Sequence, residues 1–360
     1  MLRRPKPKTL RVLAWPYRRA KNPYTRDLYD AMNEVSRGAV QIEDFRFGDA
    51  WRKRVDVVHV HWPEAAVESP STVRAALKSV ALVVTLHLMR RRGATIVWTA
   101  HNLHSHERHH PRLEAALRAR FFRLVDGVIH LSPGSVGDVA REIPELDGKP
   151  VALVRHGIPR LDTQPSKQAA RNTLGLDPCE VVWLTLGTIR PYKQVPSLIR
   201  AFGAARLRGS RLLVSGRPTP PEMADEMEAI ASDLPDVTLT LGWMDDNTFA
   251  THLAAADALL ACYAELHNSG VVVSALASGR PVLCRRSSAT ADLRELLGGE
   301  WVALLDGPLT PAVLREHEPW VRCQRDRPPA LDQLHPDAIA RATLDAYERF
   351  RRSRPATNGA

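Results

Sequence analysis

The sequence predicts an α/β protein made of two doubly wound domains. Two observations support this fold class. Short runs rich in Val, Ile and Leu alternate with longer helical patterns, and this alternation stops and then starts again in the second half of the chain. Strands that alternate with helices form parallel sheets covered on both faces. Ligands of such domains bind just past the carboxyl ends of the strands, so we expect the two domains to face a cleft.

The first half contains five apolar runs that predict buried strands, at residues 10–14, 55–61, 95–100, 127–132 and 151–155. Three helical patterns lie between them, at residues 22–34, 71–89 and 111–125. Asn22 followed by Pro23 is typical of a helix start. Gly93, just past three arginines, is typical of a helix end.

The second half repeats this organisation. Strands are predicted at residues 181–186, 211–215, 237–241, 258–261, 281–283 and 301–305. Helices are predicted at residues 194–208, 221–234, 247–256, 269–278 and 290–297. The break lies near residues 158–178, which contain three prolines, and a proline-rich stretch from 308 precedes a last basic helix at 336–352. The predicted domains are therefore residues 1–160 and 175–335, which suits about 150 residues per domain.

Charge and cysteine content narrow the class of protein. Lys and Arg number 50 against 40 Asp and Glu, for a formal net charge of +10. This favours polyanionic partners such as nucleic acid, anionic lipid or phosphorylated small molecules. The 44% of hydrophobic and 25% of charged residues exclude a disordered or fibrous chain. The four cysteines are far apart and fit no zinc or CxxC spacing, so we expect a reduced compartment.

We expect no membrane-spanning helix. The most apolar stretch, residues 80–89, has about half of the roughly 20 residues that a spanning helix needs, and it contains His87. The basic N-terminus is not followed by the apolar core and cleavage site of a signal peptide. The predicted localisation is cytoplasmic, with peripheral binding at the inner face of the membrane as an option.

Two loops that follow predicted strands suit a diphosphate. The first runs from Gly187 to Lys193, where Arg190 and Lys193 lie at a helix start. The second contains Asn268, Ser269 and Gly270 at another helix start, where backbone N–H groups lack helical partners. Each loop alone also fits an ordinary basic turn or helix cap. Together they predict a site for a nucleotide diphosphate.

Histidines follow two predicted strands of the first half. One motif runs from His59 to Glu64, and the other contains His101, Asn102 and His104. We expect His101 or Glu64 to accept a proton from an acceptor hydroxyl, because both types of side chain titrate usefully near neutral pH when partly buried. His61, Asn102 and His104 are predicted acceptor contacts. The alternative is that His59 and His61 are hydrogen-bonded core residues.

No metal site is predicted among these histidines. His106 and His109 are one residue too close for the zinc-protease helix motif. No Asp-x-Asp motif occurs in the chain.

Arginines are concentrated at residues 90–92 and 108–123, with Phe121 and Phe122 among them. They fit either solvated helix faces or a surface that meets anionic lipid and the diphosphate of a lipid-linked acceptor. We expect no nucleic-acid partner, because no nucleic-acid-binding motif accompanies the charge.

Residues 181–305 resemble the donor-binding domain of GT-B glycosyltransferases of family 4 and its relatives. Gly187 followed by Lys193 resembles the first donor loop, residues 275–282 resemble the signature helix end and next strand, and Gly242-Trp243-Met244 resembles the loop that holds the nucleotide base. The first half is less similar, at residues 128–132 and 155–159. The resemblance implies two Rossmann-like domains facing a cleft, with the acceptor on the N-terminal one, and a last helix that packs back on it.

The sequence departs from the family at a pair of glutamates eight residues apart. Leu266 and Ser274 occupy those positions, and Glu265, beside the first, is predicted to contact the donor. The Asn268-Ser269-Gly270 version and the first-half motifs are more similar to bacterial exopolysaccharide-type and β-mannosyl-type transferases. Retention or inversion of anomeric configuration stays open.

The resemblance predicts a glycosyltransferase that moves a hexose from a nucleotide-diphosphate sugar to a hydroxyl of a glycan, glycolipid or other small acceptor. The donor is expected to be GDP- or UDP-linked, with GDP-mannose favoured by the resemblance alone, and no metal cofactor is expected. Two alternatives are a nucleotide-sugar epimerase of the same architecture and a non-catalytic, membrane-associated binding protein.

Overall fold

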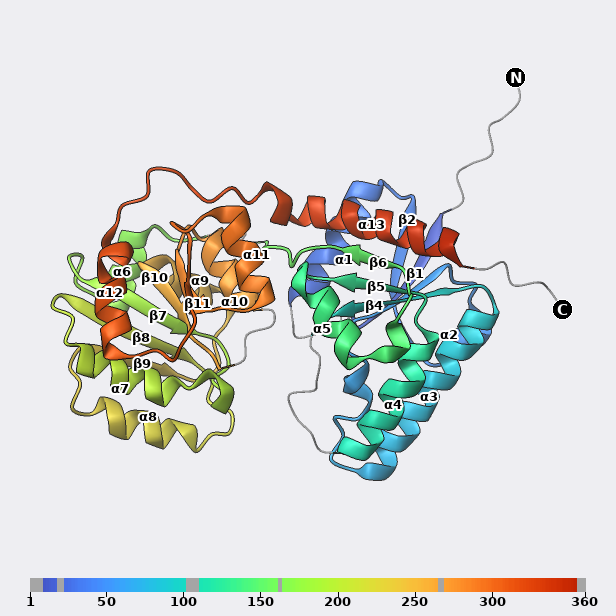
Figure 1. Cartoon of the computed structure of the whole chain (residues 1–360), viewed down its shortest axis with the longest axis horizontal. Helices are drawn as coiled ribbons and strands as arrows, with labels where there is room; N and C mark the ends of the chain where they lie inside the picture. Colours follow the sequence, from blue (N-terminus) through green and yellow to red (C-terminus); the bar gives the residue numbers. More distant parts are fainter. Residues whose placement is uncertain (1–8, 18–22, 102–109, 161–163, 265–268, 355–360) are drawn as a thin grey trace, which may run out of the picture. The chain divides into compact units, whose positions relative to one another are not determined.

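The computed structural model describes residues 9–17, 23–101, 110–160, 164–264 and 269–354. Its contacts divide the chain into two compact units (Figure 1). Unit 1 comprises Met1–Gly157 and Asp332–Ala360, and unit 2 comprises Ile158–Leu331. Each unit contains a six-stranded sheet in which the described strands pair in parallel. The predicted fold class, an α/β chain with two doubly wound domains, is therefore confirmed.

The sheet of unit 1 has the strand order β2-β1-β3-β4-β5-β6. Its strands are β1 (Leu10–Trp15), β2 (Val40–Asp44), β3 (Val57–Val60), β4 (Thr95–Ala100), β5 (Gly127–His130) and β6 (Val151–Leu153). The winding direction reverses between β1 and β3, and ligands of open parallel sheets bind outside the carboxyl ends of strands at such a point. The amide of His61 donates to the carbonyl of Trp15 over 2.9 Å at this edge.

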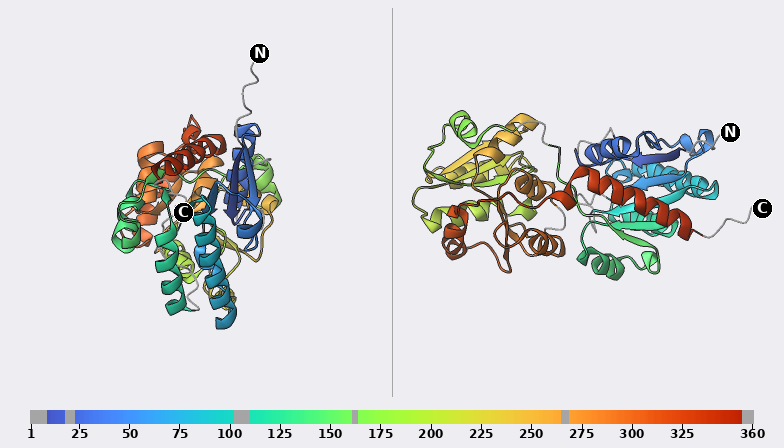
Figure 2. Two further views of the ribbon diagram at one scale, coloured as in Figure 1. Left: turned by 90° about the vertical axis from the view of Figure 1, so that its right-hand side faces the viewer. Right: turned by 90° about the horizontal axis from the view of Figure 1, so that it is seen from above.

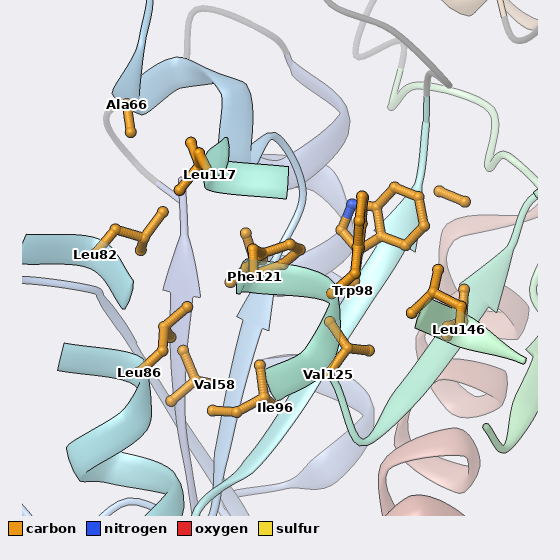
Figure 3. Close-up of a cluster of buried hydrophobic side chains, with 14 of the residues drawn as sticks. Val58, Ala66, Leu82, Leu86, Ile96, Trp98, Leu117, Phe121, Val125 and Leu146 are labelled. Carbon is orange, nitrogen blue, oxygen red and sulfur yellow. The ribbon is translucent and has the colours of Figure 1, made fainter. Parts of the chain in front are cut away.

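Helices cover both faces of this sheet. They are α1 (Pro23–Ser36), α2 (Asp49–Arg52), α3 (Thr72–Arg91), α4 (Pro111–Leu124), α5 (Gly134–Glu142) and α13 (Pro336–Ser353), with short 3-10 helices at Pro63–Ala66, Pro144–Leu146 and Asp332–Leu334. Neighbouring strand residues point to opposite faces. Val57 and Val97 pack with α1 and α13, whereas Val58 and Trp98 pack with α3 and α4 (Figure 3). The C-terminal helix thus completes the core of unit 1.

The helix α3 is longer than its apolar run at 80–89. It spans 20 residues, and it is the one helix in the described part of the chain that is long and apolar enough to cross a membrane, by length and composition only. Leu82, Leu86 and Met89 on one of its faces are buried in the core of unit 1. These contacts are those of a core helix in a folded domain.

The sheet of unit 2 has the strand order β12-β11-β10-β7-β8-β9. Its strands are β7 (Val181–Leu186), β8 (Ser210–Gly216), β9 (Val237–Leu241), β10 (Ala258–Ala261), β11 (Val282–Arg285) and β12 (Val302–Leu305). Its helices are α6 (Lys167–Leu174), α7 (Val195–Ala205), α8 (Met223–Ala231), α9 (Asp246–Ala255), α10 (Gly270–Ala277), α11 (Ser288–Leu297) and α12 (Pro311–Arg322), with a 3-10 helix at Pro191–Lys193. The winding reverses between β7 and β10, and both predicted donor loops begin at the carboxyl ends of these two strands.

Two helices of unit 2 lie where prolines predicted irregular chain. The helix α6 has a side-chain cap from Ser166 and ends at Gly175 in the left-handed conformation. The helix α12 begins after the capping Thr310 and continues past Pro319. In unit 1, β2 and α5 were not predicted either, because β2 is an edge strand with polar residues and α5 contains two glycines.

Candidate active site

The loop that follows β7 is held against the start of α10. Gly187 has a φ of +99°, in the left-handed region that favours glycine. A Cβ at this position would lie 3.2 Å from Cγ2 of Val271 and 3.7 Å from Nζ of Lys193. The amide of Ala264, between β10 and α10, donates to the carbonyl of Tyr192 over 2.9 Å. The structure therefore brings the two predicted donor loops together at one edge of the sheet.

The ends of β7, β8 and β9 are also tied together at this edge. A Cβ on Gly216 would lie only 1.9 Å from the carbonyl oxygen of Gly187, so only glycine fits there. The amide of Gly187 donates to the carbonyl of Ser215 over 2.9 Å, and the amide of Gly242 donates to that of Gly216 over 3.0 Å. The loop after β7 is thus positioned by close backbone contacts.

Lys193 is a buried cation beside this loop. It is 8% exposed, and its Nζ lies 4.7 Å from the centroid of the Tyr263 ring. Burial, with a smaller contribution from Arg190, lowers the pKa of Lys193 to about 8. A bound anion would raise the pKa of Lys193 again, because its negative charge stabilises the protonated amine against both desolvation and repulsion from Arg190. The position therefore suits a phosphate or diphosphate.

The first turn of α10 lies at the same place. Ser269 is the N-cap residue, and its side chain makes no capping hydrogen bond, which leaves that role to another acceptor. The hydroxyl of Ser274 donates to the carbonyl of Gly270 over 2.7 Å. Ser274, which stands where the family carries its second glutamate, is thus bonded within its own helix. Glu265 and Asn268, the other predicted donor contacts here, lie outside the described residues.

The predicted base-binding residues follow β9. Trp243 is 78% exposed, and Met244 is half-buried. Asp245 caps α9 by accepting a hydrogen bond from the Thr248 amide over 2.7 Å, which anchors the end of this loop. An indole ring exposed to this extent offers an aromatic face on which a nucleobase can stack.

Unit 1 brings the two histidine motifs together. His61 follows β3 and His101 follows β4, and these strands are parallel neighbours. Nδ1 of His61 lies 2.9 Å from Nε2 of His101, and Trp62 stacks on the His101 ring with centroids 4.5 Å apart. Burial lowers the pKa of both histidines well below 6.5, so both are neutral at pH 7. The predicted acceptor contacts Asn102 and His104 lie outside the described residues.

His61 belongs to a longer chain of hydrogen bonds. The Tyr29 hydroxyl lies 2.6 Å from Nε2 of His61 and 2.9 Å from Nδ1 of His59. Nδ1 of His59 is also 2.7 Å from the Tyr347 hydroxyl, and its Nε2 is 2.7 Å from Oγ1 of Thr99. His59 is thus a fully bonded core residue, and a continuous path of polar groups runs from Thr99 to the candidate base.

Sequence reasoning missed the tyrosines of this cluster. Tyr24 and Tyr29 come from α1, and Tyr347 comes from α13. The ring centroid of Tyr24 is 4.9 Å from that of His101 and 4.6 Å from that of His156. The amphipathic pattern of α1 indicates that its tyrosines are buried, but no local pattern indicates which strand they contact.

Glu64 belongs to a short helix that packs against α4. It lies in the first turn of the 3-10 helix Pro63–Ala66 and is half-buried. Burial raises its pKa to about 7. The charged groups that influence the pKa of Glu64 include Arg118 and Glu114 of α4, whereas the titratable neighbours of His101 are the histidines His156 and His59. The structure therefore pairs His101 with a histidine and places Glu64 beside α4.

The class of protein follows from the two parallel-sheet units. One unit brings the two predicted donor loops together, and the other contains a buried pair of histidines. The chain is a glycosyltransferase with the GT-B fold, and it is similar to members of family 4. Residues 180–305, which include β7 to β12, match the family model described as Glycosyl transferases group 1. The chain is also 28% identical over 329 residues to the GDP-mannose:glycolipid 4-beta-D-mannosyltransferase of Xanthomonas campestris pv. campestris, and the match covers 87% of this chain and 86% of that protein.

Solved structures share the fold. A glycosyltransferase from Rickettsia africae superposes with a TM-score of 0.66 at 10% identity, over 96% of this chain and 100% of that one. Anabaena HepE in complex with UDP and glucose superposes with a TM-score of 0.61 at 16% identity, over 95% of each chain. The family match makes this chain an enzyme that transfers a sugar from a nucleotide-sugar donor. These matches support a glycosyltransferase rather than an epimerase or a non-catalytic binding protein.

Proposed function

We propose that the enzyme transfers mannose from GDP-mannose to a hydroxyl of a lipid-linked glycan. The convergence of Gly187, Lys193 and the first turn of α10 carries this proposal, because it places a buried cation and backbone amides where a diphosphate would bind. The Xanthomonas relative, whose name specifies GDP-mannose and a glycolipid, supports the choice of donor and acceptor.

Unit 2 assists departure of the nucleoside diphosphate. As the bond between C1 of the sugar and the β-phosphate oxygen breaks, negative charge grows on that oxygen. Lys193 and Arg190 place positive charge beside it, and the amides of α10 add the positive end of the helix dipole. Trp243 and Met244 hold the base.

His101 is the proposed general base. The acceptor oxygen forms a bond to C1, the diphosphate leaves with the electrons of the broken bond, and the acceptor proton passes to Nδ1 of His101. In that tautomer Nε2–H of His101 donates to Nδ1 of His61, Nε2–H of His61 donates to the Tyr29 oxygen, and the Tyr29 hydroxyl donates to Nδ1 of His59. The Tyr347 hydroxyl also lies 2.7 Å from Nδ1 of His59, so the two tyrosine hydroxyls share the single lone pair of that nitrogen. Glu64 is the competing base.

We infer that transfer needs no divalent metal, because Arg190 and Lys193 already supply positive charge at the diphosphate. Within the described ranges, no group of three or more His, Cys, Asp and Glu side chains is arranged to hold a metal ion. Activity in the presence of EDTA should equal activity without it. A loss of activity that Mg²⁺ or Mn²⁺ restores would contradict this part of the proposal.

We also propose that the enzyme works in the cytoplasm, peripherally at the inner face of the membrane. The lipid-linked acceptor named for the Xanthomonas relative supports this, since such an acceptor is held in a bilayer. The net charge of +10 supports it as well, because the cytoplasmic leaflet carries anionic lipid.

A thermal-shift comparison of GDP, UDP, ADP and TDP tests the nucleotide. A ligand at 100 times its dissociation constant stabilises by roughly 2.7 kcal/mol, so GDP should raise Tm the most. Product analysis with GDP-mannose then tests transfer. Mannosylated lipid should form when a lipid-linked glycan is added. Free mannose as the sole product, with acceptor present, would contradict the proposal.

A further inference from the structure

A stripe of large apolar side chains on α3 faces solvent. Val73, Leu77, Val80 and Val84 are 68%, 66%, 61% and 49% exposed. Their spacing places them on one face of the helix, opposite the face that buries Leu82 in the core. Isolated apolar side chains are common on protein surfaces, but an aligned set of this kind marks a contact site.

The exposed charged side chains on the helices around this stripe are all basic: Arg74, Lys78 and Arg91 on α3, and Arg112, Arg120 and Arg123 on α4. The two helices pack side by side (Figures 1 and 2). The sequence of α3 contains no Asp or Glu, and the single acidic residue of α4, Glu114, is buried. The surface is therefore apolar along its middle and positive around it.

The positive charge around the stripe favours a lipid bilayer over a second copy of the chain as the binding partner of this surface. Two copies that paired through α3 would bring their basic side chains together with no exposed carboxylate on either helix to compensate. Anionic lipid headgroups complement the same side chains, while valine and leucine reach the boundary with the acyl chains. Because the opposite face of α3 is in the core, the helix would lie on the bilayer rather than cross it.

We propose that α3, with α4 beside it, docks unit 1 on a bilayer that contains anionic lipid. This inference rests on the proposed position of the enzyme at the membrane and names the surface that makes the contact. Docking would keep the enzyme at the surface in which its lipid-linked acceptor lies.

Co-sedimentation of the full chain with vesicles tests the proposal. The chain should bind vesicles of phosphatidylcholine mixed with phosphatidylglycerol, and it should bind pure phosphatidylcholine at least about tenfold more weakly. The triple variant L77S, V80S, V84S should also lose at least about tenfold in binding to the anionic vesicles. The control is the pair V136S, V151S, which changes two exposed valines of unit 1 away from α3 and should bind like the wild type.

Equal binding of the triple variant and the wild type, or no binding of the wild type to anionic vesicles, would overturn the proposal. A wild-type dimer, seen by light scattering without lipid and absent in the triple variant, would also overturn it.

Mannosyl transfer to a detergent-dissolved acceptor separates this inference from the proposed function. The triple variant should transfer at the wild-type rate there, and a loss of rate would place the stripe in the catalytic machinery instead. If neither protein transfers mannose but the wild type binds vesicles, the proposed function fails and the docking surface stands.

Discussion

The hydroxyl of Tyr347 lies 2.7 Å from Nδ1 of His59. Tyr347 is on α13 and His59 is on β3, and both are almost completely buried. This hydrogen bond connects the C-terminal helix to the polar chain that ends at the candidate base. The last helix therefore contributes to the site of unit 1 as well as to its core.

Replacing Tyr347 by Phe removes this bond without creating a large cavity. His59 keeps Tyr29 and Thr99 as partners, so the free energy of unfolding should fall by about 1–2 kcal/mol, measured as a lower urea midpoint. The matched control is Tyr263→Phe, because the Tyr263 hydroxyl is buried with no hydrogen-bond partner in the described part of the chain. That variant should be as stable as the wild type or more so. Equal losses in the two variants would contradict the assigned bond.

The pH dependence of the rate distinguishes the two candidate bases. The pKa of His101 is lowered well below 6.5, so this histidine is neutral near pH 7 and its titration should cause no rise in kcat/KM between about pH 6.5 and 7.5. His101→Ala should lower kcat by about 10²–10⁴-fold, whereas Glu64→Gln should change it little. A profile that rises through pH 7 in the wild type and is flat in Glu64→Gln would assign the base to Glu64, whose pKa is about 7.

Glu64 should also make stability depend on pH. Its pKa is raised from 4.5 to about 7 in the folded chain, which therefore holds a proton that the unfolded chain releases. The stabilisation is fully present below about pH 4.5 and is lost as the pH rises through 7. In urea titrations, Glu64→Gln should match the wild type near pH 4.5 and exceed its stability at pH 8. A wild type that is the more stable protein at pH 8 would refute this.

Lys193 should control donor binding. Lys193→Ala should raise KM for the donor at least about tenfold, because a charge-assisted contact to the diphosphate is lost. In the wild type, kcat/KM should fall as the pH rises through about 8, because the ammonium group of Lys193 loses its proton there in the enzyme without donor. The variant should not show this fall. Arg200→Ala, which removes an exposed cation from α7, is the control and should leave KM unchanged. Equal effects on KM would exclude a specific role for Lys193.

Two glycines provide a test of the contact between β7 and β8. Gly209 and Gly216 both have positive φ, but a Cβ on Gly209 meets no atom within 4 Å, whereas one on Gly216 meets the Gly187 carbonyl. Gly209→Ala should cost about 1 kcal/mol of unfolding free energy. Gly216→Ala should cost at least about 2–3 kcal/mol and raise KM for the donor, because the loop at Gly187 must shift. Denaturation and donor titration of both variants measure these effects, and similar values would argue against the contact.

Local patterns predicted most of the elements and the two donor loops. Apart from the polar edge strand β2, the strands of both sheets contain short apolar runs, and Gly187 and Lys193 lie close in sequence at a strand end. The helices α6 and α12 were missed because prolines dominate the sequence signal there, although Pro311 begins a helix and Pro319 is tolerated within one.

The candidate site was predicted only in part. His61 and His101 were both expected at strand ends, and the parallel pairing of β3 and β4 places them in contact. The pattern around Glu64 did not show that its 3-10 helix packs against α4, because the partner of such a short helix is set by tertiary packing.

The sequence by itself determined the alternation of strands and helices, the loops at their carboxyl ends and the excess of positive charge, because these depend on residues close together in the chain. Only the tertiary structure decided which distant side chains meet and how deeply they are buried. It joined Tyr347 to His59 across 288 positions, placed Lys193 against Gly187 and Val271, and exposed one face of α3 while burying the other. Sheet order and burial set those contacts and the pKa values that follow from them, and both arise from the packing of the whole unit.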